Sequence, residues 1–295
     1  MSFEYYEPTS LGEALSLLER EGEAGAALAG GTDLLLRERR GVRRYRSVVN
    51  IKYVPGLDAV AWDKSGELSF GALTTFRAIE THPRIASEFP ALTEGARVVA
   101  GVQLRNLATI GGNLANASPS ADSLPPLVAL DATITVASKS GSREFRVAEC
   151  ITGPGRTVLE PGEIFTQVRV PAPARRSGNA YARFSPRSAM DIGIASVAAA
   201  ITLADDGSCV DARIALGAVS PTPLRATAAE ECLRGERLNS TLVAKAADLA
   251  AEAAQPISDI RGSAEYRRAI VRVLTARMVE AAAQRAALER NDAHA

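Results

Sequence analysis

Between two apolar runs lies the polar segment Thr109-Ile110-Gly111-Gly112-Asn113-Leu114-Ala115-Asn116-Ala117-Ser118-Pro119-Ser120-Ala121-Asp122. It holds two adjacent glycines, two asparagines, two serines and one carboxylate, but no Lys, Arg or His. Gly111 and Gly112 lack a Cβ atom, so they reach positive φ at little cost and let another group approach the backbone closely. Successive backbone N–H groups in such a turn can form a concave anion site. Neutral side chains can add donors: Thr109, Asn113, Ser118 and Ser120.

These residue types are typical of a loop that binds a diphosphate without a cation. A hydrogen bond to a charged oxygen contributes roughly 1.5–3 kcal/mol, so a few such bonds would suffice. Asp122 would repel a phosphate, and it therefore suits a ribose hydroxyl or a base amine. The alternative, which an isolated Gly-Gly pair would favour, is a tight turn between two core elements.

A second glycine pair occurs in Ala29-Gly30-Gly31-Thr32-Asp33, after a short apolar run. Thr32 or Asp33 can cap a helix that runs to about Arg40. A strand, a glycine turn and a helix start together present free N–H groups and the positive end of a dipole to an anion. Alone this is an ordinary strand-to-helix turn, but two such loops could grip two parts of one dinucleotide.

Both segments resemble the paired FAD-binding signatures of the flavoprotein (medium) subunits of molybdenum hydroxylases, the carbon monoxide dehydrogenase and xanthine dehydrogenase type. Further segments match in the expected order: Gly71-Ala72-Leu73-Thr74-Thr75, Pro161-Gly162-Glu163-Ile164, Tyr181-Ala182-Arg183-Phe184-Ser185, Ala215-Leu216-Gly217-Ala218-Val219-Ser220-Pro221-Thr222-Pro223 and Ala264-Glu265-Tyr266-Arg267-Arg268. Each match is weak alone, but the ordered set is specific and covers nearly the whole chain.

The resemblance implies an α+β protein of two domains. A two-lobed FAD-binding domain of the vanillyl-alcohol oxidase (PCMH) type is expected over residues 1–173, with lobes of about 1–55 and 56–173. A CO dehydrogenase flavoprotein C-terminal-like domain, with a three-stranded antiparallel sheet and helices, is expected over 178–290. The Pro- and Gly-containing segment 171–178 is the predicted linker. The chain has no GxGxxG or GxxxxGK[ST] motif, which agrees with a fold other than the Rossmann type.

The resemblance also implies which residues bind the cofactor: Ala29, Gly30, Gly31, Thr32, Asp33, Leu73, Thr109, Ile110, Gly111, Gly112, Asn113, Ser118, Asp122, Ile164, Tyr181 and Arg183. The two glycine loops are expected along the FAD diphosphate. Backbone N–H groups and Thr32, rather than the carboxylate of Asp33, are expected to donate there. Leu73 and Ile164 are expected to line the ring pocket, or else to be plain core. Asp122 is expected near the ribose or adenine, unless it caps the helix that follows.

Arg183 takes a position that is often Lys in the family. A fixed cation near the flavin N1–C2=O edge would stabilise the reduced, anionic ring and raise its potential. A surface strand position is an equal alternative for Arg183. Tyr181 is expected to cover a face of the flavin, or else to be a core aromatic.

The expected function is electron transfer. In the family, a large molybdopterin subunit hydroxylates the substrate, and a small subunit with two [2Fe–2S] clusters relays electrons to the FAD of the medium subunit. The final acceptor is NAD, a quinone or oxygen, and the expected assembly is a dimer of heterotrimers. This chain then needs no catalytic acid or base, which fits its content of only two histidines.

Bulk properties exclude other classes. Lys plus Arg and Asp plus Glu number 34 each, whereas a nucleic-acid-binding protein would be basic. The three cysteines are far apart and form no CxxC, so no cluster or zinc site is expected on this chain. No run approaches the ~20 apolar residues of a membrane span, and the first residues do not resemble a signal peptide. A soluble, cytoplasmic protein is therefore expected.

Two alternatives from other classes remain open at this point. A free-standing FAD oxidase acting on a small organic substrate would need a catalytic base and often has a covalent flavin link. Neither His82 nor His294 is placed for such roles in the sequence. A non-catalytic nucleotide-binding module would carry no flavin.

Overall fold

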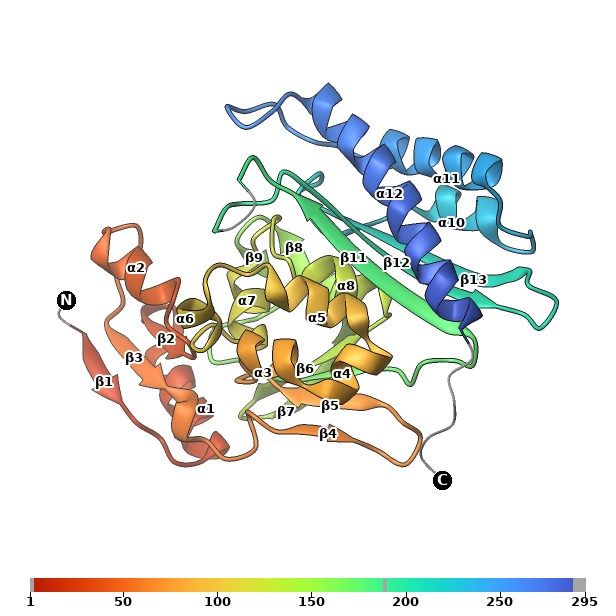
Figure 1. The fold of residues 1–295 in the computed structure, drawn as a ribbon. Helices are drawn as coiled ribbons and strands as arrows, with labels where there is room; N and C mark the ends of the chain where they lie inside the picture. The colour runs from red at the N-terminus through yellow and green to blue at the C-terminus, as the bar shows by residue number, and fades with distance from the viewer. Residues whose placement is uncertain (1–2, 188–189, 289–295) are drawn as a thin grey trace.

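The computed structural model describes residues 3–187 and 190–288. Its N-terminal lobe is a parallel sheet with strand order β1-β3-β2, at the left of Figure 1. The elements of this lobe are β1 (Glu4–Tyr6), α1 (Leu11–Glu21), η1 (Gly22–Ala24), β2 (Gly25–Leu28), α2 (Leu34–Arg39), β3 (Ser47–Asn50) and η2 (Ile51–Tyr53). The Ser10 hydroxyl accepts a hydrogen bond from Glu13 N and starts α1, while Gly22, at φ 54°, ends it. Of the two predicted caps, Thr32 and Asp33, the residue at the N-cap position of α2 is Asp33, but its side chain makes no capping hydrogen bond.

The second lobe is a five-stranded antiparallel sheet, in the order β4-β5-β10-β6-β7, with short helices packed against it (Figure 1). Its first half comprises β4 (Val60–Trp62), β5 (Leu68–Gly71), α3 (Phe76–Thr81), α4 (Pro83–Glu88), α5 (Pro90–Arg97), α6 (Val102–Arg105) and α7 (Ile110–Asn116). Its second half comprises α8 (Leu124–Ala129), β6 (Thr133–Ser138), β7 (Gly141–Arg146), α9 (Val147–Cys150), β8 (Ile151–Gly153), β9 (Arg156–Thr157) and β10 (Ile164–Val170). The core between sheet and helices is filled by fully buried side chains that include Phe70, Phe76, Phe89 and Ile134.

The segment that was expected to be a loop at Thr109–Asn113 is instead the start of helix α7. Thr109 is its N-cap, and its Oγ1 accepts a hydrogen bond from Gly112 N at 3.1 Å. Gly111 and Gly112 are not among the glycines with positive φ. The two glycines are therefore needed because neighbouring groups approach their backbone closely, and not because the backbone has an unusual conformation.

The C-terminal domain is an antiparallel sheet in the order β11-β12-β13-β14. It contains the three strands expected, β11 (Ser177–Phe184), β12 (Ala195–Leu203) and β13 (Cys209–Gly217), and adds the two-residue β14 (Leu224–Arg225). The helices α10 (Thr227–Leu233), α11 (Ser240–Ala253) and α12 (Ala264–Ala287) follow. In the described residues no helix is long and apolar enough to cross a membrane.

Both faces of this C-terminal sheet are covered. Successive side chains along a strand point to opposite faces, and here each face packs into a different hydrophobic core. Ala198, Ala200 and Ala215 join the core of the second lobe. Their neighbours, such as Val197 and Ile214, pack with α10, α11 and α12 on the opposite face. Figure 1 shows α12 lying along β11 and β12 on that outer face.

Gly178 lies inside strand β11 and not in the linker, contrary to the prediction. A Cβ atom at this position would lie 2.2 Å from the carbonyl oxygen of Ala282 in α12. Gly178 thus lets helix α12 contact the backbone of strand β11 directly. The connection between the domains ends before β11, which begins at Ser177.

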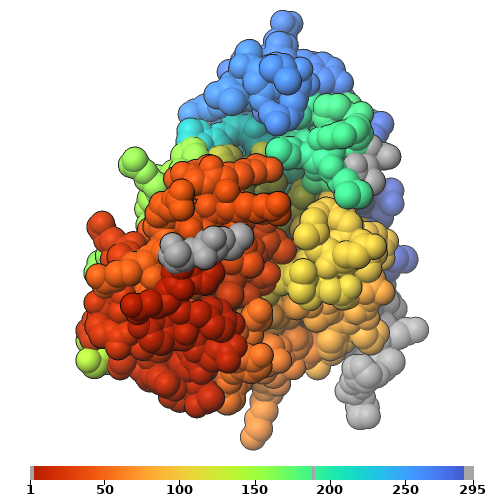
Figure 2. Space-filling view, turned by 90° about the vertical axis from the view of Figure 1, so that its left-hand side faces the viewer, coloured from red at the N-terminus to blue at the C-terminus, as the bar shows by residue number. Residues whose placement is uncertain are grey.

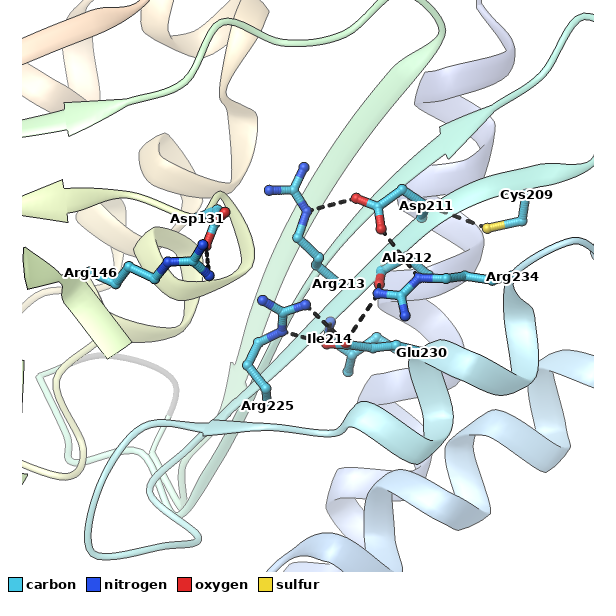
Figure 3. Close-up of polar contacts among 10 residues, drawn as sticks. All are labelled: Asp131, Arg146, Cys209, Asp211, Ala212, Arg213, Ile214, Arg225, Glu230 and Arg234. Carbon is cyan, nitrogen blue, oxygen red and sulfur yellow. Dashed lines mark hydrogen bonds and ion pairs between the residues drawn. The ribbon is translucent and has the colours of Figure 1, made fainter. Parts of the chain in front are cut away.

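The buried carboxylate of Glu230 binds strand β13 and the short strand β14 at one edge of the C-terminal sheet (Figure 3). Glu230 of α10 is 1% exposed and accepts hydrogen bonds from Ile214 N at 2.8 Å and from the guanidinium of Arg225 at 2.5 and 2.8 Å. Arg234, the residue that follows the end of α10, lies 3.5 Å from the same carboxylate. These contacts fix α10 against the sheet.

Candidate functional site

The two glycine loops meet in space, although they are far apart in the sequence. A Cβ atom on Gly30 would lie 2.0 Å from the carbonyl oxygen of Leu107, and one on Gly112 would lie 3.8 Å from Cβ of Ala29. Gly31 has φ 73°, a conformation that favours glycine. Figure 2 shows the N-terminal lobe, in red and orange, beside the yellow segment that leads into α7.

Between the two lobes lies a cavity of about 640 Å³. Eleven of the sixteen predicted site residues line it: Ala29, Gly30, Gly31, Thr32, Asp33, Leu73, Thr109, Gly111, Gly112, Asn113 and Ile164. Leu73 and Ile164 are buried and supply apolar surface. Of the other five, Ile110 is a core residue and the Ser118 hydroxyl accepts a local hydrogen bond from Ser120 N.

The backbone donors of α7 are already used within the protein. Ile110 N donates to Thr74 O at 3.0 Å and Gly111 N donates to Ala72 O at 2.9 Å. A Cβ on Gly111 would lie 2.5 Å from Cβ of Ala72, so only glycine allows this contact. The prediction that this segment offers free N–H groups is therefore wrong, because those groups join the helix start to the end of β5.

The backbone N–H groups of the first glycine loop differ from those of α7 in their hydrogen bonding. Within the described residues, no acceptor is found for the backbone N–H groups of residues 30–34. All five of these residues line the cavity. A run of N–H groups without partners at a helix start is a site for an anion. The cavity therefore fits a ligand with a diphosphate next to apolar groups.

The cavity also has polar lining residues that the sequence did not single out. They include Arg37, Arg43, Tyr45 and Asn116, and the carboxylates Glu23, Glu160 and Glu163. Arg37 follows Asp33 by one turn of α2, so helical spacing from the first loop was the signal that could have found it. Its Nη2 donates to Oδ1 of Asn116 at 2.5 Å.

Three predicted site residues lie away from the cavity lining and bind one another. Nη1 of Arg183 lies 2.7 Å from Oδ2 of Asp122, and the Tyr181 hydroxyl donates to Oδ1 of Asp122 at 2.6 Å. The Arg183 and Asp122 side chains are only 6% and 8% exposed, which excludes a surface strand position for Arg183. Their contact with the cofactor stays a prediction of the sequence.

Burial governs the charges in this cluster. It raises the pKa of Asp122, and the Arg183 guanidinium and the Tyr181 hydroxyl oppose that rise. Burial, reinforced by the neighbouring Asp122, raises the pKa of Tyr181 well above its usual range. The tyrosine is therefore a neutral donor, and the cluster joins the segment before α8 to strand β11 of the C-terminal domain.

His82, the histidine within the described residues, has a structural role. Its Nδ1 accepts a hydrogen bond from Ile85 N at the start of α4, and its ring lies 5.0 Å from that of Trp62. It does not line the cavity, and His294 lies outside the described residues.

Comparison with known proteins identifies the family. Residues 1–173 match the family described as the FAD binding domain in molybdopterin dehydrogenase, and residues 180–282 match the CO dehydrogenase flavoprotein C-terminal domain. The chain belongs to the FAD-binding medium subunits of the molybdenum hydroxylases. The chain accordingly contains an FAD-binding domain, and it is a subunit of a flavoprotein oxidoreductase.

Members of the family match along nearly their whole length. The xanthine dehydrogenase FAD-binding subunit of Escherichia coli O157:H7 is 33% identical over 94% of this chain and 95% of its own. The carbon monoxide dehydrogenase medium chain of Afipia carboxidovorans is 33% identical over 97% and 98%. The structure of carbon monoxide dehydrogenase from Hydrogenophaga pseudoflava superposes with a TM-score of 0.92 at 32% identity, over 97% of this chain and 98% of that chain. The expected fold is thus confirmed.

Proposed function

We propose that this subunit carries electrons from the [2Fe–2S] clusters of a small partner subunit to an external acceptor, which is NAD, a quinone or oxygen. The observation that carries the proposal is the run of unpaired N–H groups at residues 30–34, which lines a cavity between two lobes of an FAD-binding domain. The relatives are medium subunits of multi-subunit dehydrogenases, which implies large and small partners.

The residues that line the cavity have separate tasks in this proposal. The N–H groups of residues 30–34, with the Thr32 hydroxyl, hold the diphosphate of FAD. Leu73 and Ile164 give apolar surface to its ring system. Thr109 and Asn113 bind from the second loop through their side chains, since the backbone donors of Ile110, Gly111 and Gly112 are used elsewhere. When bound, FAD supplies the ability to accept single electrons and to deliver two.

The lining residues do not favour chemistry on an organic substrate. His82 lies elsewhere, and the described cavity lining contains no histidine or cysteine, so that Tyr45 is the one residue there of a type that forms covalent flavin links. We therefore place the hydroxylation on the large molybdopterin subunit, and we propose that the complex is a dimer of heterotrimers.

The test begins with the purified chain. It should bind FAD stoichiometrically and show a flavin spectrum, and the cofactor should be released by acid without covalent attachment. In rapid-mixing experiments, the reduced small subunit should bleach this spectrum, and NAD, a quinone or oxygen should restore it. No flavin spectrum after addition of FAD would refute the proposal, and bleaching by a small organic substrate without partner subunits would replace it with a free-standing oxidase.

A further inference from the structure

One half-buried cation reaches the cavity from outside both glycine loops. Arg37 lies in the last turn of α2 and lines the cavity together with residues of the two loops. Neither loop contains a Lys or Arg of its own. Arg43, the other cation in the described lining, is exposed, and its guanidinium carbon lies 5.4 Å from the centroid of the Tyr45 ring.

Arg37 is held in place by a residue of the second loop's helix. Its Nη2 donates to Oδ1 of Asn116, 79 positions further along the chain, at 2.5 Å. Asn116 is the last residue of α7 and also lines the cavity. The carbonyl oxygen of Arg37 accepts a hydrogen bond from Val42 N at 2.9 Å, which fixes the backbone after α2.

The guanidinium of Arg37 has donors to spare. An arginine presents five N–H donors in a rigid fork, and the hydrogen bonds of the described residues use one of them. Arginine matches the geometry of phosphate oxygens and keeps its charge at any physiological pH. The free N–H groups of residues 30–34 carry only partial charges, so they leave most of the diphosphate charge uncompensated.

We propose that Arg37 binds the diphosphate of the dinucleotide and that Asn116 positions its guanidinium. The inference rests on the proposed binding of FAD in this cavity and deepens it. The positive charge that compensates the diphosphate would then come from a residue of helix α2, because neither glycine loop contains a Lys or Arg.

The test is a titration of the full-length apoprotein with FAD, followed by flavin fluorescence. Arg37→Gln should weaken binding about ten- to hundred-fold, the effect of losing one charged hydrogen-bonding partner. Asn116→Ala should weaken it less, because the charge stays but its orientation is lost. Arg39→Gln is the matched control, since Arg39 is exposed on the same helix and does not line the cavity.

Two further measurements identify the group that Arg37 contacts. ADP carries the diphosphate without the flavin, so Arg37→Gln should weaken its competition with FAD by a similar factor. The affinity of the native protein should fall as KCl is raised, and the Arg37→Gln variant should depend less on salt. An unchanged competition by ADP would place the contact elsewhere and overturn the proposal.

Folding of each variant is checked by circular dichroism and thermal unfolding of the apoprotein. Arg37→Lys keeps the charge and should bind FAD with intermediate affinity; if it folds normally and binds as poorly as Arg37→Gln, charge is not the cause and the proposal fails. Binding of FAD to Arg37→Gln as tight as to Arg39→Gln would also refute it. In both of those cases the native protein still binds FAD, whereas a native protein without FAD affinity would refute the proposed function itself.

Discussion

Gly30 brings the backbone of the first loop against the backbone of Leu107, with no room for a side chain. A Cβ atom would lie 2.0 Å from the Leu107 carbonyl oxygen and 3.1 Å from Cα of Ala108. Both neighbours are backbone atoms, so they cannot turn away as a flexible side chain would. The contact between the loops thus depends on one missing Cβ atom.

We expect Gly30→Ala to separate the loops and release FAD, while the chain stays folded because the cores of the other elements are not touched. Gly30→Val should have the same effect more strongly. Measurements of FAD content after gel filtration and of far-ultraviolet circular dichroism check this. Gly12→Ala is the control, because nothing lies within 4 Å of a Cβ at that position in α1. Full retention of FAD by Gly30→Ala would show that the loops do not need to touch.

At the scale of elements, an ion pair between α3 and α6 supports the segment that carries Leu107. Glu80 accepts hydrogen bonds from Arg105 Nε and Arg77 Nη1, each at 2.9 Å. Arg105 also donates to the carbonyl oxygens of Val99 and Ala100 at 3.1 and 3.0 Å. Helix α6 and the chain before it are therefore held to α3 by one guanidinium.

The pKa of Glu80 gives this link a defined pH dependence. Burial raises that pKa, but the hydrogen bonds and charges of Arg77 and Arg105 outweigh burial and lower it below its usual value. An acid with a lowered pKa stabilises the fold above the pKa of the unfolded chain, and this stabilisation is lost as the pH falls through the folded pKa.

We expect Glu80→Gln to lower the free energy of unfolding by about 1–3 kcal/mol at pH 7. The difference from the native protein should shrink as the pH falls below about 4.3, the pKa of a glutamate in an unfolded chain, and through the lowered pKa of the folded state. Urea unfolding at a series of pH values measures it, and Glu280→Gln on the exposed side of α12 is the control. A difference that stays constant down to pH 3 would contradict the assigned ion pair.

At the scale of the whole molecule, polar contacts join the FAD-binding domain to the C-terminal domain. Besides the Asp122 cluster, Tyr181 N donates to Oε2 of Glu94 at 2.7 Å, and Arg285 of α12 donates to Oε1 of Glu94 at 2.6 Å. The Ala91 N–H donates to Oδ1 of Asn179 at 2.9 Å. Helix α5 and strand β11 are thus joined along their length.

We expect Arg183→Met to destabilise the protein by about 3–5 kcal/mol, because it leaves the Asp122 carboxylate buried without its countercharge. Arg187→Met removes a guanidinium whose side chain is 76% exposed from its ion pair with Asp191, and it should cost less than about 1 kcal/mol. Urea unfolding of the apoproteins compares the two. A variant of native stability with a shifted FAD reduction potential would instead support the flavin contact that the sequence predicts for Arg183.

Much of the fold followed from local patterns. Capping residues and apolar spacing predict individual elements: Thr75 is expected to cap a helix from Phe76 to about Thr81, and α3 starts there, with Thr75 Oγ1 accepting a hydrogen bond from Ala78 N. The two glycine pairs located the candidate site. The short helices α4 and α6 were not predicted, since four to six residues carry too little periodicity to reveal a helix.

The sequence by itself located the two glycine pairs, because steric freedom at glycine is a local property, and its ordered set of motifs carried the resemblance to the family and to its fold. Only the tertiary structure decided which N–H groups remain free, that Arg37 meets Asn116, and that Asp122 is buried with Arg183. Each of these depends on a partner tens of positions away, and no local pattern specifies which distant carbonyl, amide or guanidinium a given residue will meet once the chain has packed.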